Sequence, residues 1–199
     1  MACFQGLAGA ALIALALMST SAHGVDAAHV PASKQTKAGL YLDAREAYAL
    51  KQQSGTTSLL VDIRTRGEVI YLGMPALADA HIPFVDHPPG TPWDDKQARF
   101  RTEPNPDFEF ELARRLAAQG LGKQDTVILI CRSGDRSARA VNLLTERGYA
   151  KVYTVIDGYE GDALTDGPQA GQRVVNGWKN AGLPWTYKLD KSKMYLPPN

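Results

Sequence analysis

The run Thr126–Ile130 constrains the fold more than any other part of the chain. Its residues, Thr-Val-Ile-Leu-Ile, predict a strand that is covered on both faces, as in a parallel sheet. The loop Cys131–Arg136 follows at once, and Ser137–Arg147 has helical apolar spacing before Gly148. A strand, a short loop and a helix in this order predict a layered α/β domain, with the loop at the carboxyl edge of the sheet.

Further strands and helices are predicted on either side of this unit. Leu59–Ile63 and Lys151–Asp157 are short apolar runs with β-branched residues, which indicate buried strands. A helix is expected to begin at Asp43, where Glu46 completes a capping box. Another is expected at Asn105-Pro106-Asp107, an N-cap followed by proline at the first helical position.

Two segments are predicted to lack long regular elements. Residues 64–67 are expected to form a turn. Residues 73–102, rich in Pro, Gly, His and Asp, are expected to be loop apart from one short strand near 81–85. The alternation of strands and helices therefore predicts one domain with a mostly parallel sheet.

The composition is that of a globular protein. Apolar residues make up 44% of the chain and charged residues 22%, so one hydrophobic core is expected. There are 22 basic and 21 acidic residues, which give a net charge of +1. This balance argues against nucleic acid as a partner and against a disordered chain.

The N-terminus has the pattern of a targeting segment. Residues 1–22 carry no charged side chain, and the apolar run Leu7–Met18 precedes small residues, which predicts a signal peptide cleaved after Ala22 or as late as Ala28. No Lys or Arg precedes the run, as one would in most signal peptides. The uncharged stretch is almost as long as the about 20 apolar residues that a membrane span needs, so an uncleaved membrane anchor stays open. The protein is expected to be exported to the periplasm. The expected division is a mobile linker over 23–37, a domain over 38–187 and a tail over 188–199.

Cleavage would leave Cys131 as the one cysteine of the mature chain, without an internal disulfide partner. Cys131 lies between a strand end and a helix start, where unpaired backbone N–H groups create a positive field. Arg132 and Arg136 add two cations, and Gly134 lets the backbone curl into an anion-binding nest. This setting favours a reactive thiolate over an inert buried thiol.

The spacing from Cys131 to Arg136 is Cys-x4-Arg. Cysteine phosphatases use a loop one residue longer, which wraps a phosphate and brings the arginine under it. Here the corresponding position is Ser137. A cysteine phosphatase is therefore the disfavoured alternative.

The run Val127–Ser137 closely resembles the active-site strand, loop and helix start of rhodanese-like domains. The resemblance extends over roughly Gly39–Trp185. Its other marks are Leu60–Arg64, Ala80–Pro83, Tyr153–Gly161, Gly177-Trp178 and Ala181–Pro184. It implies an α/β domain with a mainly parallel sheet of about five strands and helices on both faces.

The resemblance also implies a ping-pong sulfurtransferase without a cofactor. The Cys131 thiolate would take the outer sulfur of thiosulfate or a related anionic donor, hold it as a persulfide, and pass it to cyanide, a thiol or a protein. A noncatalytic or protein-fed sulfur carrier of the same fold stays open. The residues expected to bind the donor and the persulfide are Arg132, Ser133, Gly134, Asp135, Arg136 and Ser137.

Three residues are expected to lie behind this loop. Asp62 and Arg64 would pair as a structural link, and His81 would be a structural residue near the sheet edge. His81, Asp86 and His87 do not have the three or four converging ligands that a metal site needs, so no metal is predicted. The stretches 88–106 and 161–174 are longer than in most family members, and could shape a private pocket or partner surface.

Overall fold

The structure is a computed structural model that describes residues 24–197. The predicted leader, residues 1–22, lies outside the described residues. Within 24–197, no helix has both the length and the hydropathy that crossing a bilayer requires.

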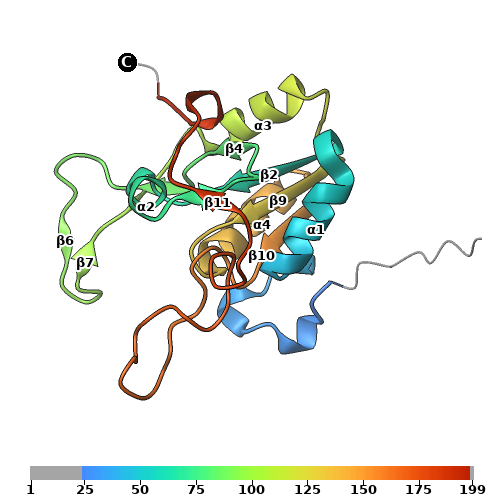
Figure 1. Ribbon diagram of the computed structural model, residues 1–199. Helices are drawn as coiled ribbons and strands as arrows, with labels where there is room; N and C mark the ends of the chain where they lie inside the picture. The colour runs from blue at the N-terminus through green and yellow to red at the C-terminus, as the bar shows by residue number, and fades with distance from the viewer. Residues whose placement is uncertain (1–23, 198–199) are drawn as a thin grey trace, which may run out of the picture.

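The centre of the molecule is a five-stranded sheet in the order β1-β10-β9-β2-β4, with every neighbouring pair parallel (Figure 1). The predicted parallel sheet of about five strands is thus confirmed. The strands are β1 (Tyr41–Leu42), β2 (Ser58–Asp62), β4 (Ala80–His81), β9 (Thr126–Ile130) and β10 (Lys151–Val155).

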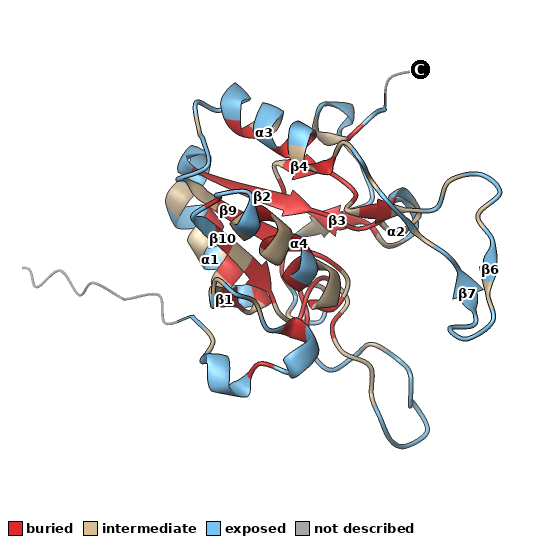
Figure 2. Cartoon of the chain, turned by 180° about the vertical axis from the view of Figure 1, so that it is seen from behind, coloured by how far each residue is buried: buried red, intermediate tan, exposed pale blue. Residues whose placement is uncertain are grey.

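Helices cover both faces of the sheet because its strands alternate apolar side chains between the two faces. On one face, Val127 and Leu129 pack in the same cluster as residues of α3 (Phe108–Ala118) and α4 (Asp135–Glu146). On the other, Ile128 and Ile130 pack with residues of α1 (Ala44–Ser54) and with Trp178. Figure 2 shows the sheet as a buried layer between these helices.

The helix starts agree with the sequence only in part. Asp43 and Glu46 form the predicted capping box of α1, with each side chain accepting the other residue's backbone N–H. The predicted start at Asn105-Pro106 is wrong by a few residues, since α3 begins at Phe108. The Asn105 side chain accepts the Asp107 N–H instead, forming a turn before the helix.

The expected turn at 64–67 is instead the start of α2 (Arg66–Leu72). A second capping box begins this helix: the Glu68 N–H donates to Thr65 Oγ1, and the Thr65 N–H donates to Glu68.

The expected loop over 73–102 is also more structured. It contains β3 (Met74–Pro75), which pairs with β11 (Trp185–Thr186), and β5 (Val85–Asp86), which pairs with β8 (Glu103–Pro104). It also contains the antiparallel hairpin of β6 (Trp93–Asp94) and β7 (Arg99–Phe100), which projects from the domain near α2 (Figure 1).

Residues 24–37 are not the mobile linker that their composition suggested. They form the 3-10 helices η1 (Ala27–His29) and η2 (Ala32–Lys34). Val30 and Lys34 are buried, and Lys34 Nζ lies 2.7 Å from Asp162 Oδ1 in the long loop after β10. Apolar burial and this ion pair hold the segment against the domain.

The C-terminal segment also packs on the domain. The Tyr195 hydroxyl donates to Asp107 Oδ2 at 2.6 Å, just before α3. The Arg115 guanidinium donates to the carbonyls of Ser192 and Met194, around the 3-10 helix η4 (Lys191–Lys193).

Candidate active site

Cys131 follows β9 directly and is 1% exposed. Its Sγ lies 3.2 Å from the Gly134 backbone N and 3.4 Å from the Ser137 backbone N, and both N–H groups point at the sulfur. Sγ itself donates to Ser137 Oγ at 3.5 Å, and that hydroxyl donates to the Gly134 carbonyl and lies 2.7 Å from Thr154 Oγ1. The two backbone N–H groups that point at Sγ suit a negatively charged sulfur.

The loop keeps its shape because the segment after β10 binds its carbonyl groups. The Cys131 carbonyl accepts the Tyr159 N–H at 2.8 Å, and the Arg132 carbonyl accepts the N–H groups of Glu160 and Gly161 at 3.0 and 3.2 Å. Every peptide bond here is trans, so the N–H groups of Arg132 and Ser133 point away from this segment. The carbonyl bonds therefore turn these backbone donors toward the inside of the loop.

Two glycines make this close approach possible. Gly134 has φ 99°, and a Cβ there would overlap the Ile156 carbonyl. Gly158 has φ 64°, and a Cβ there would lie 2.6 Å from the Arg132 carbonyl group. A side chain at either position would strain the backbone and separate the loop from the segment after β10.

Arg136 is held by a partner that the sequence did not predict. Its guanidinium donates two hydrogen bonds to the Glu68 carboxylate, with NH1 at 2.7 Å from Oε2. Burial alone would raise the pKa of Glu68, but the hydrogen bonds and charge of Arg136 lower it to about 2. The pair is therefore fully ionised at neutral pH, and Glu68 balances the charge of Arg136. The Thr65-x-x-Glu68 capping pattern could have indicated α2, though not its partner in α4.

Asp62, Arg64 and His81 lie together beneath the site and do not line its cavity. Asp62 and Arg64 form a fully buried ion pair, with NH2 2.6 Å from Oδ2, and the guanidinium also donates to the Gly73 carbonyl. It stacks on the Tyr159 ring at 3.7 Å. His81 Nε2 lies 2.8 Å from the Arg64 carbonyl, and burial lowers the pKa of this imidazole. The predicted pairing of Asp62 with Arg64 is confirmed.

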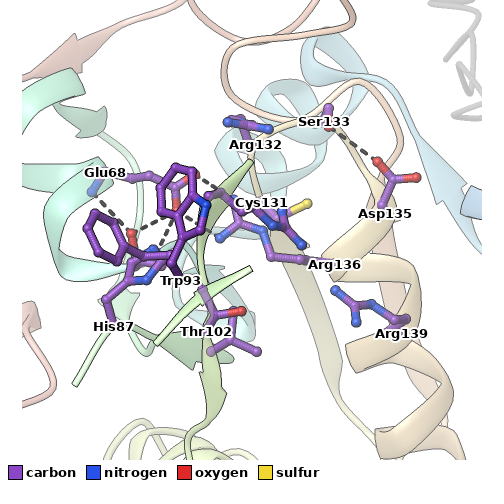
Figure 3. A pocket seen from close by; sticks show the side chains of 14 residues that line it. Glu68, His87, Trp93, Thr102, Cys131, Arg132, Ser133, Asp135, Arg136 and Arg139 are labelled. Atoms are coloured by element: carbon purple, nitrogen blue, oxygen red, sulfur yellow. Dashed lines mark hydrogen bonds and ion pairs between the residues drawn. The ribbon is translucent and has the colours of Figure 1, made fainter. Parts of the chain in front are cut away.

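A cavity of about 500 Å³ opens above Cys131 (Figure 3). Its inner lining comes from Cys131, Arg132, Ser133, Asp135 and Arg136, together with Thr65 and Glu68 from the start of α2. Its outer lining comes from Val85, His87, Trp93, Arg99, Phe100, Thr102 and Arg139. Gly134 and Ser137 do not line the cavity; their backbone N–H groups lie behind it, against Sγ.

Asp135, one of the residues expected to bind the donor, lines the cavity and accepts a hydrogen bond from Ser133 Oγ at 3.3 Å. Over residues 24–197, no three His, Cys, Asp or Glu side chains form a metal-binding group. His87 Nδ1 lies 2.9 Å from the Arg101 carbonyl at the cavity edge.

Sequence reasoning missed the outer lining. Trp93, Arg99 and Phe100 belong to the β6–β7 hairpin, inside the stretch 88–106, for which a private pocket or partner surface was expected without any residue being named. No short-range signal marks that hairpin, whose strands are two residues each.

A parallel sheet with helices on both faces, whose central strand ends in a buried cysteine that accepts two backbone N–H groups, defines an α/β domain with a cysteine site at the carboxyl edge of the sheet. The chain belongs to the rhodanese-like domain family, whose model matches residues 43–163.

The chain is also similar to several individual proteins. The chain is 30% identical over 135 residues to the uncharacterized protein RC0915 of Rickettsia conorii, an alignment that covers 67% of this chain and 87% of the relative. It is 29% identical over 134 residues to an uncharacterized RP600 homolog of Rickettsia rickettsii, with the same coverage. Among solved structures, it is similar to Rv0390 from M. tuberculosis, with a TM-score of 0.55 and 26% identity over 74% of this chain and 97% of that chain.

Proposed function

We propose that the protein is a sulfurtransferase that carries sulfane sulfur as a persulfide on Cys131. The observation that carries the proposal is the position of Sγ, within 3.4 Å of the backbone N atoms of Gly134 and Ser137 at the base of a cavity lined by arginines. N–H donors fixed by the backbone stabilise negative charge without having to reorganise during the reaction. Both the attacking thiolate and the persulfide carry that charge.

The transfer has two steps, with thiosulfate as the donor. The Cys131 thiolate attacks the outer sulfur, the sulfur–sulfur bond of thiosulfate breaks, and sulfite leaves with the bonding electron pair. A nucleophile such as cyanide or a thiolate then attacks the outer sulfur of the persulfide, and the Cys131 thiolate leaves. Neither step needs an external oxidant, reductant or cofactor.

The arginines have different roles in this proposal. Glu68 balances the charge of Arg136, so this pair fixes α2 against the start of α4. Arg132 forms no ion pair with any residue of 24–197 and lines the cavity beside Cys131. Arg132 is therefore the loop cation that attracts the anionic donor.

Intact-mass spectrometry before and after exposure to thiosulfate tests the proposal, with Cys131→Ser as the control. We expect the wild type alone to gain the mass of one sulfur atom and to lose it again on addition of cyanide. A wild-type protein that never gains sulfur, at any thiosulfate concentration, would contradict thiosulfate transfer.

We also propose that the protein acts outside the cytoplasm, with a small thiol or a protein thiol as acceptor. The uncharged, apolar residues 1–22 support export. Cell fractionation of the full chain with a C-terminal tag is expected to place a shortened protein in the periplasm. A full-length protein in the membrane fraction would favour the anchor, and one in the cytoplasm would contradict export.

A further inference from the structure

The β6–β7 hairpin presents two aromatic side chains to the cavity that contains Cys131. Trp93 and Phe100 pair edge to face, with ring centroids 5.2 Å apart, and both line the cavity. They are 48% and 59% exposed, although large aromatic side chains usually bury much of their surface. Figure 3 shows Trp93 in the same pocket as Cys131 and Arg136. The pair is therefore an apolar surface available to a bound molecule.

The same cavity carries an excess of positive charge. Four arginines line it, against the two carboxylates Glu68 and Asp135. Glu68 is engaged by Arg136, whereas Arg99, Arg132 and Arg139 make no ion pair within residues 24–197. Unpaired arginines around a hollow attract an anion.

The cavity also exceeds what the donor anion alone would fill. A volume of about 500 Å³ lies within the range of roughly 300–1,000 Å³ that is typical for drug-sized ligands. Thiosulfate has no apolar part that could contact Trp93 or Phe100.

We infer that the β6–β7 hairpin is a specificity element, in which Trp93 and Phe100 hold the apolar body of an organic sulfur compound while Arg99 and Arg139 attract its charge. The inference rests on the proposed function, because the reacting sulfur must reach Cys131. An organic thiosulfonate has this chemistry as a donor, and an aromatic thiol that carries a carboxylate has it as an acceptor.

The thiosulfonate reaction balances without a further reactant. The Cys131 thiolate attacks the outer sulfur, the bond between that sulfur and the sulfonyl sulfur breaks, and a sulfinate leaves with the electron pair. In the acceptor case, the aromatic thiolate takes the outer sulfur of the persulfide, and the Cys131 thiolate leaves.

Separate measurement of the two half-reactions tests the inference and distinguishes donor from acceptor. Loading of Cys131 is followed with benzenethiosulfonate and with thiosulfate. Unloading of the persulfide is followed with 4-mercaptobenzoate and with cyanide. The variants are Trp93→Ala with Phe100→Ala, and Arg99→Gln. Their matched controls are Phe110→Ala and Arg45→Gln, which replace residues that are exposed and outside the cavity.

We expect the wild type to prefer the aromatic compound over the small one in at least one half-reaction. In that half-reaction, the second-order rate constant with the aromatic compound should be about tenfold lower in the aromatic double variant, since an aromatic contact and its buried area are removed together. Its rates with thiosulfate and cyanide should change less than twofold. Arg99→Gln should lower the rate constant with the aromatic anion by a smaller factor. The two control variants should have the same rate constants as the wild type.

Equal losses with aromatic and small compounds would overturn the inference, because the hairpin would then only support the site. So would a wild type without any aromatic preference. In both cases thiosulfate would still load Cys131 and the proposed function would stand. A wild-type protein that no donor loads would overturn both.

Discussion

The cavity has a floor and a rim that are built in different ways. The floor, residues 131–137, comprises the loop after β9 and the first residues of α4, is largely buried, and holds its donors through backbone hydrogen bonds. The rim, residues 93–100, is an exposed hairpin with two residues in each strand. Figure 2 shows the same contrast between the buried sheet and the exposed hairpin. The difference indicates that the surroundings of Cys131 Sγ depend on the core, whereas the outer lining of the cavity depends on side chains that the core does not need.

Gly134→Ala tests the floor and should have the largest effect. A Cβ at this φ of 99° overlaps the Ile156 carbonyl, so the backbone must move and the Gly134 N–H must leave Sγ. We expect persulfide formation to slow by about 100-fold or more, the effect typical of losing one fixed donor, and stability to fall by about 1–3 kcal/mol. Rapid-quench mass spectrometry and urea unfolding measure the two effects.

Gly122→Ala is the matched control, because its Cβ would meet nothing within 4 Å and its φ is not positive. Wild-type loading in Gly134→Ala would contradict the role assigned to the floor.

Glu68→Gln tests the link between α2 and the floor. The carboxylate has a pKa of about 2 in the folded protein against an ordinary 4.5, so its contribution to stability is present above about pH 4.5 and lost as the pH falls toward 2. At pH 7 we expect the variant to be about 2–3 kcal/mol less stable than the wild type in urea unfolding. The difference in the free energy of unfolding between the variant and the wild type should become steadily smaller as the pH falls from about 4.5 toward 2.

Glu109→Gln provides the comparison for Glu68→Gln. Glu109 pairs with Lys123 and Arg147, both of which are about half exposed. The free energy of unfolding is therefore expected to fall by less than about 1 kcal/mol in Glu109→Gln. If the stability difference between Glu68→Gln and the wild type did not depend on pH, the charge of Glu68 would not contribute to the stability of the fold.

Trp93→Ala tests the rim and should have the smallest effect on stability. Trp93 is half exposed and packs against Phe100 of the same hairpin, so the free energy of unfolding should fall by less than about 1 kcal/mol. A larger loss in urea unfolding would mean that the rim is part of the folded core, and the contrast between floor and rim would fail.

Local sequence patterns predicted the floor of the cavity. Most of the other parts of the site depend on contacts between residues that are far apart in the sequence. Thr126–Ile130 determines its own strand by its composition, and Cys131 and Gly134 follow it closely enough in sequence to place the loop. The Asp62–Arg64 pair was predictable because only Ile63 separates its members in the sequence. Glu68 and Arg136 lie 68 residues apart, and no pattern joins them. The hairpin was missed because its strands are too short to show alternation, and its aromatic pair forms only once the turn has closed.

The N-terminal segment shows the same limit. Residues 24–37 have the composition of a linker, but Lys34 is buried beside Asp162, a residue from the far end of the chain. Composition describes average preference, whereas one ion pair between a buried lysine and a partly exposed, distant aspartate, together with buried Val30, can hold a polar segment in place.

The hydrogen bonds from Tyr159, Glu160 and Gly161 to the loop carbonyls have a consequence for protein engineering. The loop does not hold its own shape: residues 131–137 and 156–161 form one unit that is discontinuous in sequence. Grafting the Cys-x4-Arg loop alone onto another parallel sheet would transfer the thiol without the orientation of its donors. A working graft needs both segments, on adjacent strands, with the register between β9 and β10 preserved.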